Sequence, residues 1–174
     1  MSPSIHPRSW CIVVSGVSGS GKTTVARLLA KRLDIPFAEA DDFHPPANIA
    51  KMSAGVPLDD ADRQPWLEAV GHWLHERDTT ETGGVVACSA LKRRYRDILR
   101  EACPGVFFLH LTASHELLVE RLGRRTGHFM ARSLLDSQIA ALEPLEPGER
   151  GAELDVTPAP DIVVDLATRL LPCQ

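Results

Sequence analysis

Lys22 and Thr23 close a glycine-rich segment, residues 16–23, that reads GVSGSGKT and fits the pattern G-x-x-x-x-G-K-[ST]. Glycines let backbone N–H groups turn toward an anion, because no Cβ blocks its approach. In this pattern the lysine reaches the β- and γ-phosphates of a nucleotide, and the Thr hydroxyl binds Mg²⁺. We therefore predict a phosphate-binding loop. The residues expected to contact the nucleotide phosphates are Gly16, Val17, Ser18, Gly19, Ser20, Gly21, Lys22, Thr23 and Thr24.

Three acids, Glu39, Asp41 and Asp42, follow a short apolar run where a parallel strand would end. Transfer of a phosphoryl group to a hydroxyl needs a residue that orients the hydroxyl and accepts its proton. Asp41 is the predicted base, while Glu39 or Asp42 could instead act through a metal-bound water. The alternative is a solvated acidic loop that caps a helix.

A second charged group follows these acids and comprises His44, Lys51, Asp60, Asp62 and Arg63. A small anionic polyol would need cations for its acid group and carboxylates for its hydroxyls. Each residue alone could equally lie on the surface, and Asp62 could simply cap the helix before Pro65.

A third group, Arg121, Arg124, Arg125 and His128, ends one predicted helix and enters the loop beyond it. An arginine on a mobile lid can stabilise charge on the transferring phosphoryl group, and the lid would exclude water. Cations that complement a helix dipole are the alternative, and both can hold. We predict a mobile lid over about residues 121–142, with Arg121 and Arg124 as catalytic residues.

Alternating strands and helices must position these groups. Apolar runs predict strands at residues 10–15, 35–38, 85–88, 106–111 and 151–156. Helical spacing predicts the intervening helices, among them residues 22–33, 47–54 and 161–171. A helix within residues 128–142 is expected to bury Leu134, Leu135, Ile139 and Leu142. This order favours an α/β fold with a parallel sheet covered on both faces, in which residues 16–23, 39–44 and 89–92 meet at the carboxyl ends of the strands.

The bulk properties are those of an ordinary globular domain. The chain has 174 residues and a net charge of −4, with no basic stripe, so nucleic acid is not an expected partner. No apolar run approaches the length of a membrane span. Residues 1–9 lack the apolar core of a signal peptide and are expected to be a flexible tail, followed by a single domain over residues 10–174. The cysteines Cys11, Cys88, Cys103 and Cys173 share no metal-type spacing, and reduced thiols suit the cytoplasm.

Three segments carry a resemblance to a known family: ADDFHPPANIAKMSAGVPLDDADRQPW at residues 40–66, CSALKRRYRD at 88–97, and RTGHFM with LLDSQ within 125–138. The chain closely resembles the gluconate kinases of the small phosphate-loop (P-loop) kinase superfamily, from about residue 11 to residue 165. The most specific parts are the pattern D-x-H-P-x-x-N-x-x-K-M at residues 42–52 and the GHF triplet at residues 127–129.

The resemblance implies ATP- and Mg²⁺-dependent phosphorylation of D-gluconate to 6-phosphogluconate. It also implies a three-layer P-loop kinase fold with a five-stranded parallel sheet, a core related to shikimate and nucleotide kinases, and a homodimer. Arg121 would lie near the adenine or phosphates, and the loop at Thr157 and Pro158 would cover the adenine. Substrate-binding candidates are Asp41, His44, Lys51, Arg63, Ser89, Lys92 and His128. Which of Lys51, Arg63, His44 and Lys92 holds the gluconate carboxylate stays open.

The sequence departs from the family pattern at Glu39, where relatives commonly have Asp. Many P-loop enzymes also place a metal-positioning Asp after the third strand, where this chain has Ser89. Metal orientation would then fall to Thr23 and the acids after the second strand, with Glu39 as the named metal candidate. Two alternative functions remain: another small-molecule P-loop kinase with a shikimate-like or nucleotide acceptor, and a regulatory module that binds ATP without catalysis.

Overall fold

The computed structural model describes residues 10–124 and 129–172. The predicted N-terminal tail, Arg125, His128 and Cys173 lie outside the described residues. Within the described part of the chain, no helix is both long and apolar enough to cross a membrane.

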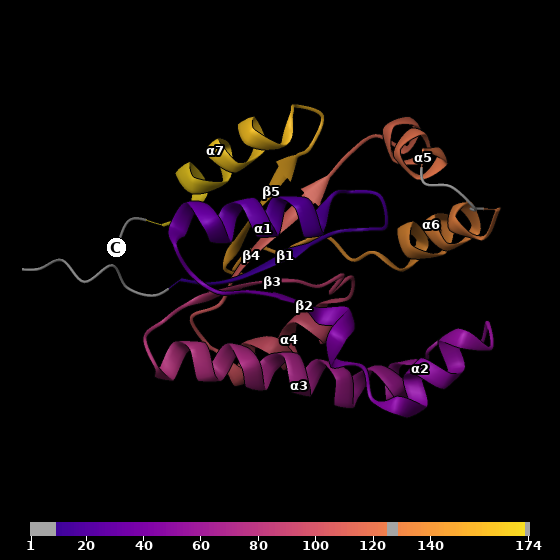
Figure 1. Cartoon of the computed structure of the whole chain (residues 1–174), viewed down its shortest axis with the longest axis horizontal. Helices are drawn as coiled ribbons and strands as arrows, with labels where there is room; N and C mark the ends of the chain where they lie inside the picture. The colour runs from indigo at the N-terminus through magenta and orange to yellow at the C-terminus, as the bar shows by residue number, and fades with distance from the viewer. Residues whose placement is uncertain (1–9, 125–128, 173–174) are drawn as a thin grey trace, which may run out of the picture.

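A five-stranded parallel sheet forms the centre of the fold, as predicted (Figure 1). The strand order is β2-β3-β1-β4-β5. Its strands are β1 (Cys11–Ser15), β2 (Phe37–Glu39), β3 (Gly84–Ala87), β4 (Phe107–Thr112) and β5 (Gly151–Asp155). Every residue of β1 is buried, because β1 pairs with β3 on one side and β4 on the other. The loop that leaves β1 therefore opens at the centre of the sheet's carboxyl edge, between the loops that leave its neighbours.

Helices cover both faces of this sheet and complete three layers. Helices α1 (Lys22–Leu33) and α7 (Pro160–Leu170) lie on one face, and α3 (Asp60–Thr79) and α4 (Arg93–Ala102) lie on the other (Figure 1). The side chains of β1 alternate between the two: Ile12 and Val14 join the first core cluster, whereas Cys11 and Val13 join the second. This alternation follows from the two-residue period of a strand.

The remaining helices gather beyond the carboxyl ends of the strands (Figure 1). They are the short η1 (Ala40–Phe43), α2 (Pro46–Ser53), α5 (His115–Gly123) and α6 (Phe129–Ala141). The predicted apolar seam of α6 is wrong in part: Leu135 is fully buried, but Leu134 and Ile139 are 51% and 38% exposed. The buried apolar face of α6 is therefore narrower than predicted. Leu135 attaches it to the rest of the fold by packing in a small cluster with Val17 and residues of α5.

The start of α3 differs in detail from the alternative in which Asp62 caps this helix. Asp59 is the N-cap, and its side chain accepts a hydrogen bond from the Asp62 amide. The Asp62 carboxylate in turn accepts a hydrogen bond from the Asp59 amide, which completes a capping box. Asp62 therefore supports the cap from the third helical position and does not form the cap itself.

The cysteines Cys11, Cys88 and Cys103 are free, buried thiols, as expected. Burial is the main cause that raises the pKa of Cys88 to about 12, so this thiol stays neutral. The ligand atoms of Cys11, Cys103 and Asp78 lie within 4.8 Å of one another, near the amino end of β1 and away from the phosphate-binding loop. Both sulfurs belong to the apolar core, so we interpret them as packing groups.

Candidate active site

The loop between β1 and α1 has the backbone shape that its glycines permit. Gly16 has φ 149°, and a Cβ at this position would lie 2.7 Å from Ser20 Oγ and 3.0 Å from the Leu111 carbonyl oxygen. Gly21, at φ 85°, precedes the first residue of α1. Helix α1 therefore begins directly under the loop, and its N-terminal N–H groups can face an anion held there.

A pocket of about 290 Å³ opens beside this loop. It brings together residues predicted to bind ATP from three separate parts of the chain: Gly19, Ser20, Gly21, Thr24, Arg121 and Pro158. Arg121 is held at the pocket by a hydrogen bond from Nη2 to the Val156 carbonyl, 2.6 Å long. Arg124 also lines the pocket, and its guanidinium donates to Glu120 on the same helix.

Thr23 on α1 and Glu39 at the end of β2 lie side by side, although β3 separates β2 from the strand that precedes α1. Thr23 Oγ1 donates to Glu39 Oε2 at 2.6 Å. Both are hard oxygen donors of the kind that Mg²⁺ prefers, and both stand at the mouth of the phosphate-binding loop. Asp41 and Asp42 follow in η1, and both are exposed.

His44 stacks on Trp66 with ring centroids 4.5 Å apart. Asn48 is buried below this pair and donates to the Asp62 carbonyl at 2.9 Å. Burial lowers the pKa of His44 below its usual 6.5, against the opposing effect of Asp41 and with a contribution from Arg63. The ring is therefore neutral at pH 7 and does not serve as a cation there.

The other candidate cations differ in their partners. Lys51 Nζ lies 2.8 Å from the Asp62 carboxylate, and Lys92 Nζ lies 3.2 Å from Asp60 Oδ1. Arg63 instead donates to the Leu58 carbonyl at 2.6 Å and lies 5.7 Å from the centroid of the Tyr95 ring. Among the described residues, Arg63 forms no ion pair within 4.0 Å.

Comparison with known proteins identifies the family of this chain. The family model for shikimate kinase matches residues 18–149. A gluconokinase from Gluconobacter oxydans is 49% identical over 88% of this chain and 86% of its own length. The chain belongs to the gluconokinase family.

Solved structures agree with this membership. A gluconokinase from Sinorhizobium meliloti is 47% identical, with a TM-score of 0.83 over 94% of this chain and 92% of that one. An unliganded sugar kinase from Janibacter is 48% identical, with a TM-score of 0.86 over 94% of each chain. The gluconokinase resemblance read from residues 40–66 is thus confirmed, and so is the P-loop kinase fold.

Two contacts of this gluconokinase-family site were not predicted. Gln138 on α6 accepts a hydrogen bond from the Ser18 amide at 2.6 Å, so the predicted lid region touches the phosphate-binding loop. Ser15 Oγ lies 3.1 Å from Nδ1 of the buried His110, directly behind that loop. The LLDSQ segment contains Gln138, but no local pattern indicates a partner 120 residues away.

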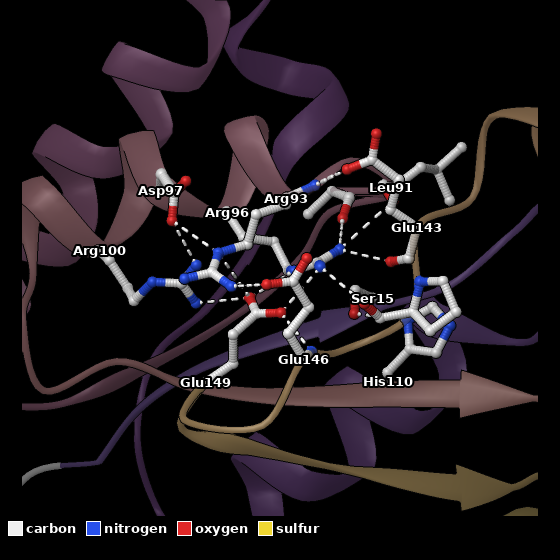
Figure 2. A network of polar contacts seen from close by, with 12 residues as sticks. Ser15, Leu91, Arg93, Arg96, Asp97, Arg100, His110, Glu143, Glu146 and Glu149 are labelled. Atoms are coloured by element: carbon white, nitrogen blue, oxygen red, sulfur yellow. Dashed lines mark hydrogen bonds and ion pairs between the residues drawn. The ribbon is translucent and has the colours of Figure 1, made fainter.

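A buried polar network also borders the site (Figure 2). Its centre is Arg96 on α4, which pairs with Glu149 from the connection between α6 and β5. Arg100 lies 2.8 Å from the same carboxylate. Burial by itself would raise the pKa of Glu149, but hydrogen bonds from Arg96, the Glu146 amide and Arg100 outweigh it and lower the pKa to about 2.

The low pKa of Glu149 predicts that the folded chain loses stability in acid. Because Glu149 ionises more readily in the folded chain, its stabilisation is complete above its usual pKa of 4.5 and is lost as the pH falls toward about 2. The shift corresponds to about 3 kcal/mol. Glu149→Gln should be less stable than wild type at pH 7, and the gap should narrow by up to that amount as the pH falls. Urea unfolding across this range measures it, with Glu101→Gln, at an exposed carboxylate on α4, as control. A gap that is constant with pH would contradict the assignment.

Proposed function

We propose that the protein catalyses the ATP-dependent phosphorylation of D-gluconate to 6-phospho-D-gluconate. The observation that carries this proposal is the placement of residues 39–66. The Thr23–Glu39 contact sets the start of this segment against the phosphate-binding loop, and His44, Trp66 and Arg63 follow within it. These residues are suited to a small anionic polyol, and the family membership supports gluconate as that polyol.

The proposed reaction needs no covalent enzyme intermediate. The loop amides and Lys22 would hold the β- and γ-phosphates of ATP, while Thr23 and Glu39 would hold Mg²⁺, which neutralises phosphate charge when bound. Asp41 would accept the proton of the gluconate 6-hydroxyl as its oxygen bonds to the γ-phosphorus. The bond from that phosphorus to the β–γ bridging oxygen breaks, and ADP leaves. Arg121 and Arg124 would stabilise charge on the transferring group.

We assign the gluconate carboxylate to Arg63. Lys51 and Lys92 are each matched with an aspartate, and His44 is neutral at pH 7. Arg63 contacts the Leu58 carbonyl and the ring and hydroxyl of Tyr95, which are uncharged, so its charge can still be paired by a substrate acid. A guanidinium also suits a carboxylate because it can donate two parallel hydrogen bonds. Lys51, Lys92, Ser89 and His44 would then contact or order the hydroxyl chain.

Glu39→Gln should raise the Mg²⁺ concentration needed for half-maximal turnover by roughly 10- to 100-fold, because an amide is a weaker ligand or water acceptor than a carboxylate. Titration of MgCl₂ at saturating ATP and gluconate measures this. Glu101→Gln changes an exposed carboxylate on α4 and should leave the requirement unchanged. An unaltered Mg²⁺ requirement in Glu39→Gln would remove Glu39 from the metal site.

A panel of acceptors tests the function itself. ADP formation by the whole chain would be measured with gluconate, shikimate and nucleoside monophosphates. We expect turnover with gluconate alone. Turnover with shikimate or a nucleotide and none with gluconate would indicate another small-molecule kinase. Tight ATP binding without acceptor-dependent turnover would instead indicate a regulatory module.

The family resemblance also leads us to propose a homodimer in the cytoplasm. The free thiols of Cys11, Cys88 and Cys103 suit a reducing compartment. Light scattering of the purified chain tests the dimer, and a monomer at micromolar concentration would contradict it.

A further inference from the structure

Arg96 is a charged side chain that is only 1% exposed, and its hydrogen bonds reach two separate loops. Nη1 donates to the carbonyls of Ala90 and Leu91, at 3.4 and 3.3 Å, and to that of Glu143 at 2.9 Å. Nη2 donates to the Pro144 carbonyl at 3.2 Å. The guanidinium therefore joins the loop after β3 to the segment that follows α6 (Figure 2).

The loop after β3 needs such support. Ala90 has φ 39°, in the left-handed region that is unfavourable for a residue with a Cβ. Its preceding residue is tied to the phosphate-binding loop, because the Gly16 amide donates to the Ser89 carbonyl at 3.4 Å. Beyond Ala90, the Glu143 amide donates to the Leu91 carbonyl at 2.8 Å. The Arg96 guanidinium bonds both carbonyls of this strained turn, which leads directly to Lys92.

Glu149 determines the orientation of that guanidinium. Its side chain is fully buried, and its two oxygens accept from Arg96 Nε at 2.8 Å and from Nη2 at 3.0 Å. This two-bond contact fixes the guanidinium plane and leaves Nη1 directed at the loop carbonyls. The Glu146 amide donates to Glu149 Oε2 at 2.7 Å, so the carboxylate is itself held in place.

We propose that Arg96, oriented by Glu149, is a positioning residue for the gluconate pocket. It holds the Ala90–Leu91 turn so that Ser89 and Lys92 present their side chains to the sugar acid. Lys92 also contacts Asp60 at the start of α3, so a shift of the turn would spread to that element. The inference rests on the proposed function, and it assigns to Arg96 no contact with substrate.

Arg96→Met tests this role, because methionine fills similar space without hydrogen-bond donors. We expect the KM for gluconate to rise, with kcat/KM for gluconate falling roughly 10- to 100-fold as the pocket is misplaced. The KM for ATP should rise much less, because β1 and α1 also support the phosphate-binding loop, which meets the turn through the bond from the Gly16 amide to the Ser89 carbonyl. Arg96→Lys serves if the Met variant does not fold. It keeps the charge beside Glu149, but one ammonium group cannot bond both the carboxylate and the turn, so it should raise the gluconate KM as well.

Arg100→Met is the matched control. Arg100 lies one helical turn beyond Arg96 and contacts the same Glu149 oxygen, but its described contacts do not reach residues 90–92. It should lower thermal stability and leave the gluconate KM unchanged. An equal rise in gluconate KM for Arg100→Met, equal rises in both substrates' KM, or no rise in either Arg96 variant would overturn the inference. A wild-type chain without gluconate turnover would instead overturn the proposed function, and the inference with it.

Discussion

Lys22→Ala is expected to phosphorylate gluconate at least about 100-fold more slowly than wild type, with the loss in kcat. The ammonium group would follow the charge that moves onto the β–γ bridging oxygen, so its removal costs more in the transition state than in the ground state. Lys22 Nζ donates to the Val17 carbonyl at 3.1 Å, within the loop. Initial rates of ADP formation at saturating ATP and gluconate measure the effect.

Lys31→Ala is the control for this variant. Lys31 is an exposed lysine in the last turn of the same helix, so its loss should leave kcat unchanged. Thermal unfolding of both variants should stay close to wild type, because neither side chain is part of the core. Wild-type turnover by Lys22→Ala would overturn the assignment of residues 16–23 as the catalytic phosphate-binding loop.

Asp41→Asn is expected to lower kcat by roughly 10²- to 10⁴-fold while ATP binding persists. The amide has nearly the shape of the carboxylate and can still accept a hydrogen bond, but it cannot take the proton of the 6-hydroxyl. Single-turnover rates with gluconate measure the chemical step, and a fluorescent ATP analogue measures nucleotide affinity.

Asp42→Asn gives the matched comparison, because Asp42 is the next residue of η1 and is also exposed. Loss of the Asp42 carboxylate should lower kcat far less than loss of the Asp41 carboxylate. If Asp42→Asn loses activity and Asp41→Asn retains it, the base is Asp42. Loss of ATP binding in Asp41→Asn would place this carboxylate on the nucleotide side of the site.

The elements nearest the phosphate-binding loop could be predicted from the sequence because their signals are local. An apolar run gives β1, the glycine pattern gives the turn, and α1 covers residues 22–33 as predicted. The end of α1 also has a local cause, because Asp34 adopts the left-handed conformation that ends many helices. The parallel order of strands follows from the alternation with helices, and residues 40–66 indicate the family.

The same reasoning explains where local patterns were insufficient. The apolar spacing of α6 identified a helix but not the depth of its burial, so Leu134 and Ile139 were wrongly expected in the core. The candidate cations of the acceptor site were equivalent in the sequence. Only the packing of α2 and α4 against the start of α3 separates them, since it pairs Lys51 with Asp62 and Lys92 with Asp60.

The sequence by itself therefore determined the chemistry: a phosphate-binding loop, acids at the end of β2, a charged acceptor segment and the family. Only the tertiary structure decided which distant residues contact one another. Arg96 and Glu149 are 53 residues apart, and Ser18 and Gln138 are 120 apart. No helical or strand period relates residues at such separations, because their contact depends on how whole elements pack and on which buried polar group must be satisfied.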